Sequence, residues 1–120
     1  MANQEIPKLI IVSPCYNEEA ILRYSADTLT SFLKRVIALG KIAPSSRILY
    51  VNDGSRDRTW SLIEELHKDN SFVEGLSLAK NVGSELAVMA GMMAARERAD
   101  VVVTIDADLQ DDVEAIEEMI

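Results

Sequence analysis

The sequence predicts an α/β domain with a Rossmann-like parallel sheet and helices on both faces. Two observations support this fold class. Short apolar runs rich in β-branched residues alternate with longer segments whose apolar residues recur at helical spacing. The short runs are apolar at successive positions, which is typical of strands covered on both faces. The length of 120 residues fits a single domain.

Four apolar runs are predicted to be strands, because they are too short for helices and end at residues typical of turns. They cover residues 8–13, 47–52, 73–80 and 101–105, and the third run is the weakest. Pro14 is expected to end the first strand and to fix the backbone as it leaves the sheet. Because a helical segment separates each strand from the next, the strands are expected to pair in parallel.

The first helix is expected over residues 17–40. Asn17 is its predicted N-cap, and Glu18 and Glu19 would lie in the first turn, where acidic side chains suit the helix dipole. Gly40 is the predicted stop, since glycine readily adopts the left-handed conformation found just after many helices.

The second helix is expected over residues 55–70, with Ser55 or Asp57 as its N-cap. Its apolar side would be formed by Trp60, Ile63 and Leu66. The third helix is expected over 84–99 and the last over 111–120. Small residues on one face of the third helix would let it lie close to its neighbour; they are Ala87, Ala90, Gly91 and Ala94. The five methionines, three of them in VMAGMM, are expected to fill the core.

Charge and cysteine content narrow the function classes. A net charge of −8 argues against a nucleic-acid-binding face, although a divalent cation can bridge acidic side chains to the phosphates of a nucleotide. With Cys15 as its one cysteine, the sequence cannot form an intramolecular disulfide, which favours a reducing, cytoplasmic compartment. The start, MANQEIPK, lacks the features of a signal peptide, and no run approaches the ~20 apolar residues of a membrane span.

Polar and acidic residues follow every predicted strand. The four segments are PCYNEE (14–19), NDGSRDRT (52–59), KNVGSE (80–85) and DADLQDD (106–112). Because ligands of parallel sheets bind beyond the carboxyl ends of the strands, these segments are expected to converge on one candidate site.

The last segment has the donor atoms of a metal site. In an extended backbone Asp106, Asp108 and Gln110 would point to the same side, presenting two carboxylates and an amide oxygen. Hard cations such as Mg²⁺ and Mn²⁺ prefer such oxygen ligands. The alternative is a solvated loop in which Asp111 or Asp112 only caps the last helix.

Two further strand ends offer groups that suit a nucleotide. Asp53-Gly54 resembles a hairpin turn, but helical spacing follows it, so a tight strand-to-helix turn is predicted. Asp53 would then accept hydrogen bonds from a base or ribose, or it would merely cap the next helix. The ring of Tyr16 could stack on a base.

The segments SPCYNEE, VNDGSRDRT, KNVG and DADLQDD, in this order and spacing, resemble the family 2 glycosyltransferases of the GT-A fold. The likeness is strongest to polyprenyl-phosphate sugar transferases of the dolichol-phosphate mannose synthase type. It implies transfer of a sugar, with inversion, from a UDP- or GDP-linked donor to a lipid-phosphate or glycan acceptor, assisted by Mg²⁺ or Mn²⁺.

The same resemblance assigns roles to individual residues. The donor nucleotide would be bound by Pro14, Tyr16, Glu18, Asn52, Asp53, Lys80 and Asp106, and the metal by Asp108, Gln110 and Asp106. Asn52 stands where many members have a second Asp, and Asp112 where lipid-phosphate transferases usually have Pro. No catalytic residue is assigned.

The resemblance also implies that residues 1–120 are the nucleotide-sugar-binding part of a longer enzyme and end before its acceptor-binding half. Such a fragment is expected to bind donor without turnover and to self-associate through uncovered apolar surface and a free strand edge. The longer protein is expected at the cytoplasmic face of a membrane.

Other α/β classes fit less well. A haloacid dehalogenase-type phosphotransferase or a receiver domain would carry its acids after the first strand, where this chain has SPCYN. A dinucleotide-binding oxidoreductase would carry G-x-G-x-x-G after a strand, and none is present. A module that binds nucleotide without catalysis remains the non-enzyme alternative.

Overall fold

The computed structural model of the protein describes residues 6–109 and 113–120. Strands and helices alternate as predicted from the sequence. In chain order they are β1 (Leu9–Cys15), α1 (Leu22–Ala38), β2 (Arg47–Asn52), α2 (Thr59–Asp69), β3 (Val73–Ser77), α3 (Ser84–Ala95), β4 (Val101–Thr104) and α4 (Ala115–Met119). Gln110, Asp111 and Asp112 lie outside the described residues.

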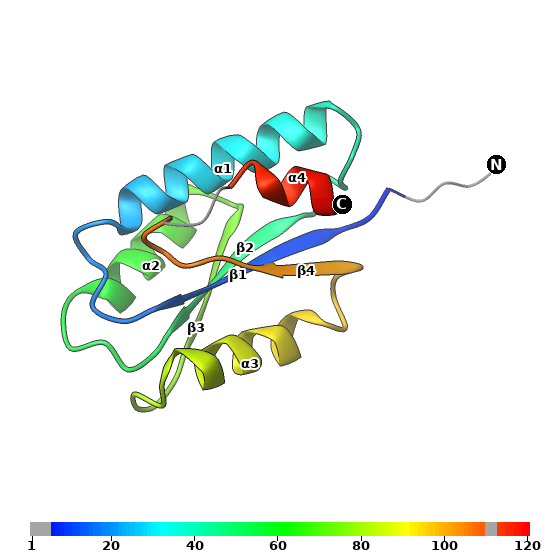
Figure 1. Ribbon diagram of the computed structural model, residues 1–120. Helices are drawn as coiled ribbons and strands as arrows, with labels where there is room; N and C mark the ends of the chain where they lie inside the picture. The colour runs from blue at the N-terminus through cyan, green and yellow to red at the C-terminus, as the bar shows by residue number, and fades with distance from the viewer. Residues whose placement is uncertain (1–5, 110–112) are drawn as a thin grey trace.

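The strands form one parallel sheet in the order β3-β2-β1-β4. Helices α1, α2 and α4 lie over one face of the sheet and α3 over the other (Figure 1). The predicted Rossmann-like α/β class is therefore confirmed. Because all strands run the same way, their carboxyl ends gather at one edge of the sheet.

The core has two layers, one on each face of the sheet. On the α1 side the hydroxyl of Tyr50 is fully buried and shares a 2.8 Å hydrogen bond with Ser25 Oγ. On the α3 side, Ile10 and Val12 of β1 pack with residues of β2 beneath the helix. Both faces of β1 are thus buried, which explains its continuous apolar sequence.

Helix α3 lies close to the sheet because its inner face is made of small residues. A Cβ atom on Gly91 would come within 2.5 Å of Val12 Cγ1 and 2.7 Å of Val51 Cγ2. Ala87 and Ala95 are buried on the same face. The predicted small-residue face is confirmed at Ala87 and Gly91, and Ala90 is half-buried, but Ala94 is exposed and Ala95 takes its place.

The expectation that the methionines fill the core was wrong for α3. Met89, Met92 and Met93 are 55%, 42% and 62% exposed. The small residues occupy the face turned toward the sheet, so the methionines of this helix point away from it. Together with Leu86, which is also exposed, they form an apolar surface that we call the α3 outer face.

The start of α1 differs from the prediction, whereas its end is confirmed. Asn17 is not an N-cap but has a positive φ of 53°, and Glu18 and Glu19 precede the helix. The N–H groups of residues 17–19 bond to side chains of a distant loop, which holds them out of the helix. At the other end Gly40 has a φ of 76°, and its N–H donates to the carbonyl of Ile37.

Pro14 does not end β1, which continues to Cys15. In a parallel strand, residues two positions apart point their backbone groups to the same side. The Val12 carbonyl accepts the N–H of Ile105 on the β4 side, so the nitrogen of Pro14 also faces that side. There β4 has already ended at Thr104, and the missing N–H of proline therefore removes no bond from the sheet.

The boundaries of the later elements are tighter than predicted. Helix α2 begins at Thr59 with Arg58 at the N-cap position, so neither predicted N-cap, Ser55 or Asp57, holds it; the Asp57 carboxylate, one residue earlier, accepts the N–H of Thr59 at 2.9 Å. Strand β3 ends at Ser77 because β2, its one partner, ends opposite it at Asn52. Helix α3 ends at 95 and α4 starts at 115, so both are shorter than predicted.

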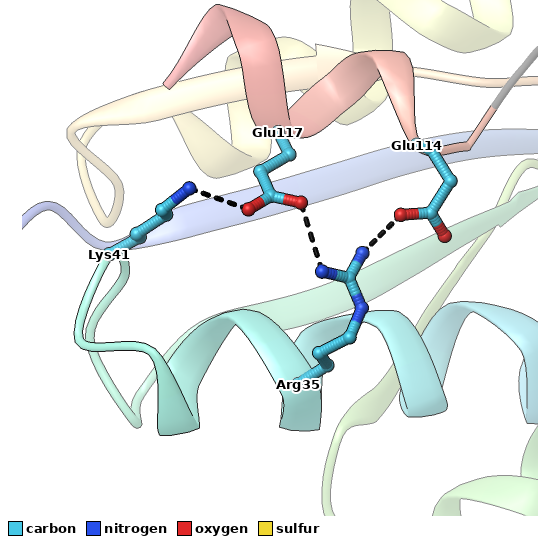
Figure 2. A network of polar contacts seen from close by, with 4 residues as sticks. All are labelled: Arg35, Lys41, Glu114 and Glu117. Atoms are coloured by element: carbon cyan, nitrogen blue, oxygen red, sulfur yellow. Dashed lines mark hydrogen bonds and ion pairs between the residues drawn. The ribbon is translucent and has the colours of Figure 1, made fainter.

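Ion pairs join α4 and the residue before it to α1 and to the loop that follows α1 (Figure 2). Arg35 donates to Glu117 at 2.9 Å and also pairs with Glu114, while Lys41 donates to the other oxygen of Glu117 at 2.6 Å. Ile116 is the buried residue of this helix. These contacts hold α4 on the α1 face of the sheet.

Candidate functional site

A hollow of about 130 Å³ lies at the carboxyl edge of the sheet. Its lining residues come from the ends of β1, β2 and β4 and from the start of α3: Pro14, Cys15, Tyr16, Glu18, Asp53, Ser84, Asp106, Ala107 and Asp108. Six of the predicted site residues are brought together in what we call the carboxyl-edge hollow. The segments after β1 and β4 contribute most of the lining, whereas the segment after β2 contributes Asp53 and the segment after β3 contributes Ser84.

Asp106 and Asp108 both line the hollow, but a turn rather than an extended backbone brings them there. Both are exposed, whereas Ile105 and Ala107 are buried. The N–H of Leu109 donates to the carbonyl of Asp106 across a turn at residues 107–108, and Leu109 has a φ of 57°, so the expected extended segment does not continue past Asp106. The predicted third ligand, Gln110, lies outside the described residues.

Glu18 reaches the same hollow from the loop after β1. Partial burial and the negative charges of Asp108, Asp106 and Asp57 raise the pKa of its carboxyl group above the ordinary value. The carboxylates therefore create a negative potential at this edge of the sheet. A cation placed there would be stabilised.

The oxygen ligands fit a hard divalent cation, but the site they form is incomplete. Within residues 6–109 and 113–120, no three His, Cys, Asp or Glu side chains are grouped closely enough to hold a metal ion. Mg²⁺ and Mn²⁺ are often bound by one or two carboxylates, with phosphate oxygens completing the shell. Asp106 and Asp108 suit that mode better than a metal cage made of protein alone.

Asp53 is buried and bound to the loop that precedes α3. The side chain is 2% exposed; Oδ1 accepts the N–H of Val82 at 2.8 Å, and Oδ2 accepts the N–H of Gly83 and the Asn81 amide, each at 3.1 Å. It does not cap α2, the structural role considered from the sequence. Sequence reasoning missed this contact because the partners lie about thirty residues away.

The turn after β2 packs directly on the same loop. Gly54 has a φ of 66°, and a Cβ atom at this position would lie 2.3 Å from the backbone nitrogen of Asn81. Only glycine fits both the conformation and the close approach. Asp53 and Gly54 together fix the relative positions of the loops after β2 and β3.

Asn52 and Lys80 do not line the hollow. Asn52 is 4% exposed; its amide donates to Ser77 Oγ at 3.0 Å, and its oxygen accepts the N–H of Ser55 at 3.2 Å. Lys80 is exposed, three residues beyond the end of β3. Asn52 therefore shapes the turn behind the hollow, while Lys80 lies in solvent.

Cys15, Ser84 and Ala107 line the hollow although the sequence analysis did not select them. Burial, with a smaller contribution from Glu18, raises the pKa of the Cys15 thiol far above its ordinary value. The thiol thus stays protonated and is a poor nucleophile. Ser84 could be identified only from the fold, because it is the first residue of α3.

A parallel α/β sheet with acidic side chains at its carboxyl edge defines a ligand-binding domain of the Rossmann-like class. The family model described as Glycosyl transferase family 2 matches residues 10–120. The chain belongs to this family, which confirms the resemblance noted in the sequence.

Several curated proteins share this region. An uncharacterised glycosyltransferase of Bacillus subtilis (strain 168) is 47% identical over 94% of this chain and 34% of its own length. The bactoprenol glucosyl transferase of Shigella phage SfV is 36% identical over 94% of this chain and 34% of its own length. The undecaprenyl-phosphate 4-deoxy-4-formamido-L-arabinose transferase of Shewanella sediminis (strain HAW-EB3) is 36% identical over 98% of this chain and 34% of its own length. The chain spans about a third of the length of these relatives.

A solved structure has the same fold. The mannosyltransferase of Pyrobaculum calidifontis, determined in complex with GDP-mannose and Mn²⁺, matches with a TM-score of 0.71 at 18% identity. The match covers 87% of this chain and 28% of the other. In the part of this chain that the structure describes, no helix is long and apolar enough to cross a membrane.

Proposed function

We propose that residues 1–120 form the donor-binding part of a glycosyltransferase that moves a sugar from a nucleotide diphosphate to an acceptor. The observation that carries this proposal is the convergence of Asp53, Asp106 and Asp108 with Glu18 at the carboxyl-edge hollow. Family membership supports the reaction class. The donor's nucleotide would lie across the ends of β1, β2 and β4.

The metal would be Mg²⁺ or Mn²⁺, held by Asp106 and Asp108, with Gln110 as the predicted further ligand. The structural neighbour was determined with Mn²⁺ and GDP-mannose, which supports a divalent ion beside a nucleotide sugar in this fold. When bound, such an ion acts as a Lewis acid that neutralises the charge of the diphosphate leaving group. The ion would also offset the repulsion that Glu18 experiences, because the added positive charge stabilises the ionised form of its carboxyl group.

The nucleotide would contact Pro14, Tyr16, Glu18 and Asp53. The hollow is smaller than the ~300 Å³ at which ligand pockets begin, so it would hold only part of the donor. Tyr16 is 42% exposed and leaves a ring face free for stacking on a base. A carboxylate has about four lone-pair sites; Asp53 uses three for the loop and keeps one for a base or ribose group.

Asn52 and Lys80 would act from outside the hollow. Asn52 would orient Asp53, because its side chain bonds to both Ser55 and Ser77 and so fixes the turn after β2. The ammonium group of Lys80, on a long exposed side chain, would approach a phosphate of the bound donor.

The acceptor would be a lipid phosphate, since two of the relatives are named for transfer to bactoprenol or undecaprenyl phosphate. A phosphate oxygen of the acceptor would attack the anomeric carbon and form the new C–O bond. The bond to the nucleotide diphosphate would break on the opposite face, which inverts the configuration. The longer protein would then act at the cytoplasmic face of a membrane.

The test is a titration of this chain with UDP and GDP, with and without Mn²⁺, alongside Asp108→Asn. We expect metal-dependent binding of one nucleotide that is lost in Asp108→Asn and kept in Glu97→Gln, an exposed carboxylate on the other side of the fold. Binding that is unaffected by both Mn²⁺ and Asp108→Asn would contradict the metal role. Binding without sugar transfer to polyprenyl phosphate, even in the longer protein, would favour the non-catalytic module.

A further inference from the structure

The loops after β1 and β2 are joined by hydrogen bonds between backbone and side chains. Three successive N–H groups, those of residues 17–19, donate to side-chain oxygens of the segment 55–59. The bonds run from Asn17 N to Ser55 Oγ (2.9 Å), from Glu18 N to Thr59 Oγ1 (2.8 Å), from Glu19 N to Asp57 Oδ2 (3.3 Å), and back from Arg56 N to Asn17 Oδ1 (2.8 Å). We call these four bonds the loop clasp.

Asp57 and Thr59 act as a unit within the clasp. The fully buried Thr59 donates its hydroxyl hydrogen to Asp57 Oδ1 at 2.5 Å, which leaves its lone pairs for the N–H of Glu18. Burial raises the pKa of Asp57, but hydrogen bonds from Thr59 and Glu19 outweigh it, so the net shift is downward. Asp57 is therefore charged at neutral pH and fixes the direction of the Thr59 hydroxyl.

The clasp restrains the loop after β1 against electrostatic repulsion from the loop after β4. Tyr16 and Glu18 line the carboxyl-edge hollow, and Asn17 between them has the left-handed backbone conformation. Glu18 is repelled by Asp106 and Asp108 from the facing loop. An unrestrained loop of this kind would relax away from the other carboxylates. The side chains of the clasp do not line the hollow, so they act on it only through the loop.

We propose that Asn17, Ser55, Asp57 and Thr59 are positioning residues that hold Tyr16 and Glu18 at the wall of the donor site. The identity of the ligand rests on the proposed function, but the restraint on the loop does not. The proposal gives the DGSRDRT segment a second role besides forming the turn after β2.

The test compares Thr59→Val, which removes the hydroxyl at nearly constant shape, with Thr59→Ser, which keeps it. Thr28→Val, a half-buried site on α1 away from the hollow, is the matched control. Two quantities are measured: the rate of Cys15 alkylation, and the affinity for UDP and GDP in Mn²⁺. Cys15 is 1% exposed and directly precedes the restrained loop, so its alkylation reports loop opening. Alkylation is measured at a fixed interval below each variant's Tm, which removes differences in global unfolding.

In Thr59→Val we expect Cys15 to react about tenfold faster and the nucleotide to bind about tenfold more weakly, the factor set by loss of the bond from the Glu18 N–H, which is the bond of Thr59 that holds the loop. Thr59→Ser should restore both quantities, and Thr28→Val should change neither. Unchanged alkylation in Thr59→Val would overturn the proposal. So would faster alkylation with unchanged nucleotide affinity, because the clasp would then be only structural.

The test still decides the proposal if Thr59→Val fails to fold or if the chain binds no nucleotide. If Thr59→Val does not fold, Ser55→Ala takes its place, since it removes one bond of the clasp at a partly exposed position. If the unsubstituted chain binds neither UDP nor GDP, the proposed function fails for this chain. The alkylation rates then decide by themselves whether the clasp holds the loop.

Discussion

At the scale of one residue, the position of Glu18 in the candidate site works against the stability of the fold. Its carboxyl group lies in the wall of the hollow and senses the charges of Asp106 and Asp108. The pKa of Glu18 is raised by partial burial first and by these neighbours second. A group placed for stability alone would have been paired with a cation. This arrangement is consistent with a candidate site that binds a cation.

We therefore expect Glu18→Gln to stabilise the chain at pH 7. The folded state binds the Glu18 proton more tightly than the unfolded state, so stability falls as pH rises from about 4.5 through the folded pKa. Glutamine removes this loss, with an expected gain below about 1 kcal/mol because solvent screens the group.

Urea unfolding at pH 7 and pH 4 measures the effect. The gain should be present at pH 7 and nearly absent at pH 4, where the unfolded glutamate is itself largely protonated. Glu97→Gln is the control, as an exposed glutamate on the far side of the fold. A Glu18→Gln variant that is less stable at pH 7, or equally changed at both pH values, would contradict the prediction.

Among the elements, α4 depends most on charge. A helix of five residues is not stable in isolation, so contacts with the rest of the chain must hold it. Ile116 is buried, and the apolar residues on either side of the helix pack on the same core. The ion pairs of Arg35 and Lys41 with Glu117 and of Arg35 with Glu114 add to these contacts. Hydrogen bonds from Lys41 and Arg35 lower the pKa of Glu117.

We expect Glu117→Gln to loosen α4 while leaving the sheet intact. A lowered folded pKa contributes stability above the unfolded value of 4.5, and this contribution is lost as pH falls through the folded pKa. Acid should therefore have the same effect as the substitution. One molar salt should weaken the same contacts, since exposed ion pairs are strongly screened.

Amide hydrogen exchange is the measurement. Exchange of Ile116 to Met119 should accelerate several-fold in Glu117→Gln at pH 7, whereas β1 and β2 should be unchanged. Glu118→Gln, an exposed glutamate on the same helix, is the matched control. Equal exchange in the two variants would show that the apolar contacts alone hold the helix.

At the scale of the whole molecule, strand edges and an apolar helix face are left uncovered within the described residues. There β4 pairs only with β1 and β3 only with β2, so each has one edge with no strand beside it, and the β4 edge lies next to α3. The α3 outer face carries Leu86, Met89, Met92 and Met93, and Arg96 and Val102 adjoin it. Exposed apolar surface beside a free strand edge favours association, although a net charge of −8 opposes it.

We expect this chain to self-associate as its concentration rises, and Met93→Glu to reduce that association. The substitution places a charge in the apolar surface and adds to the repulsion between copies. Sedimentation velocity across a hundredfold range of concentration measures it. Ser31→Glu, with the same charge change at an exposed site on α1, should have a smaller effect. A chain that stays monomeric at all concentrations would contradict the prediction.

The features predicted correctly are those that depend on nearby residues. The strand 47–52 was predicted with its observed ends, because its apolar run stops at turn residues. Gly40 ends α1 through bonds to residues three to five positions away. Asp106 and Asp108 both reach the hollow because they directly follow β4, although a turn takes the place of the extended backbone that was expected there. The alternation of strands and helices predicted the parallel sheet, and with it the edge where the polar segments meet.

By itself, then, the sequence determined the fold class, the family and the edge of the sheet that carries the site. The tertiary structure decided what individual polar groups do there. Asn17 became part of a clasp instead of a cap, and Asp53 was bound by the loop before α3. The methionines of α3 were left outside because smaller residues fit against the sheet. The hydrogen bonds of the clasp and of Asp53 join residues 28 to 41 positions apart, and α3 packs on two strands that precede it by more than thirty residues; local spacing specifies neither.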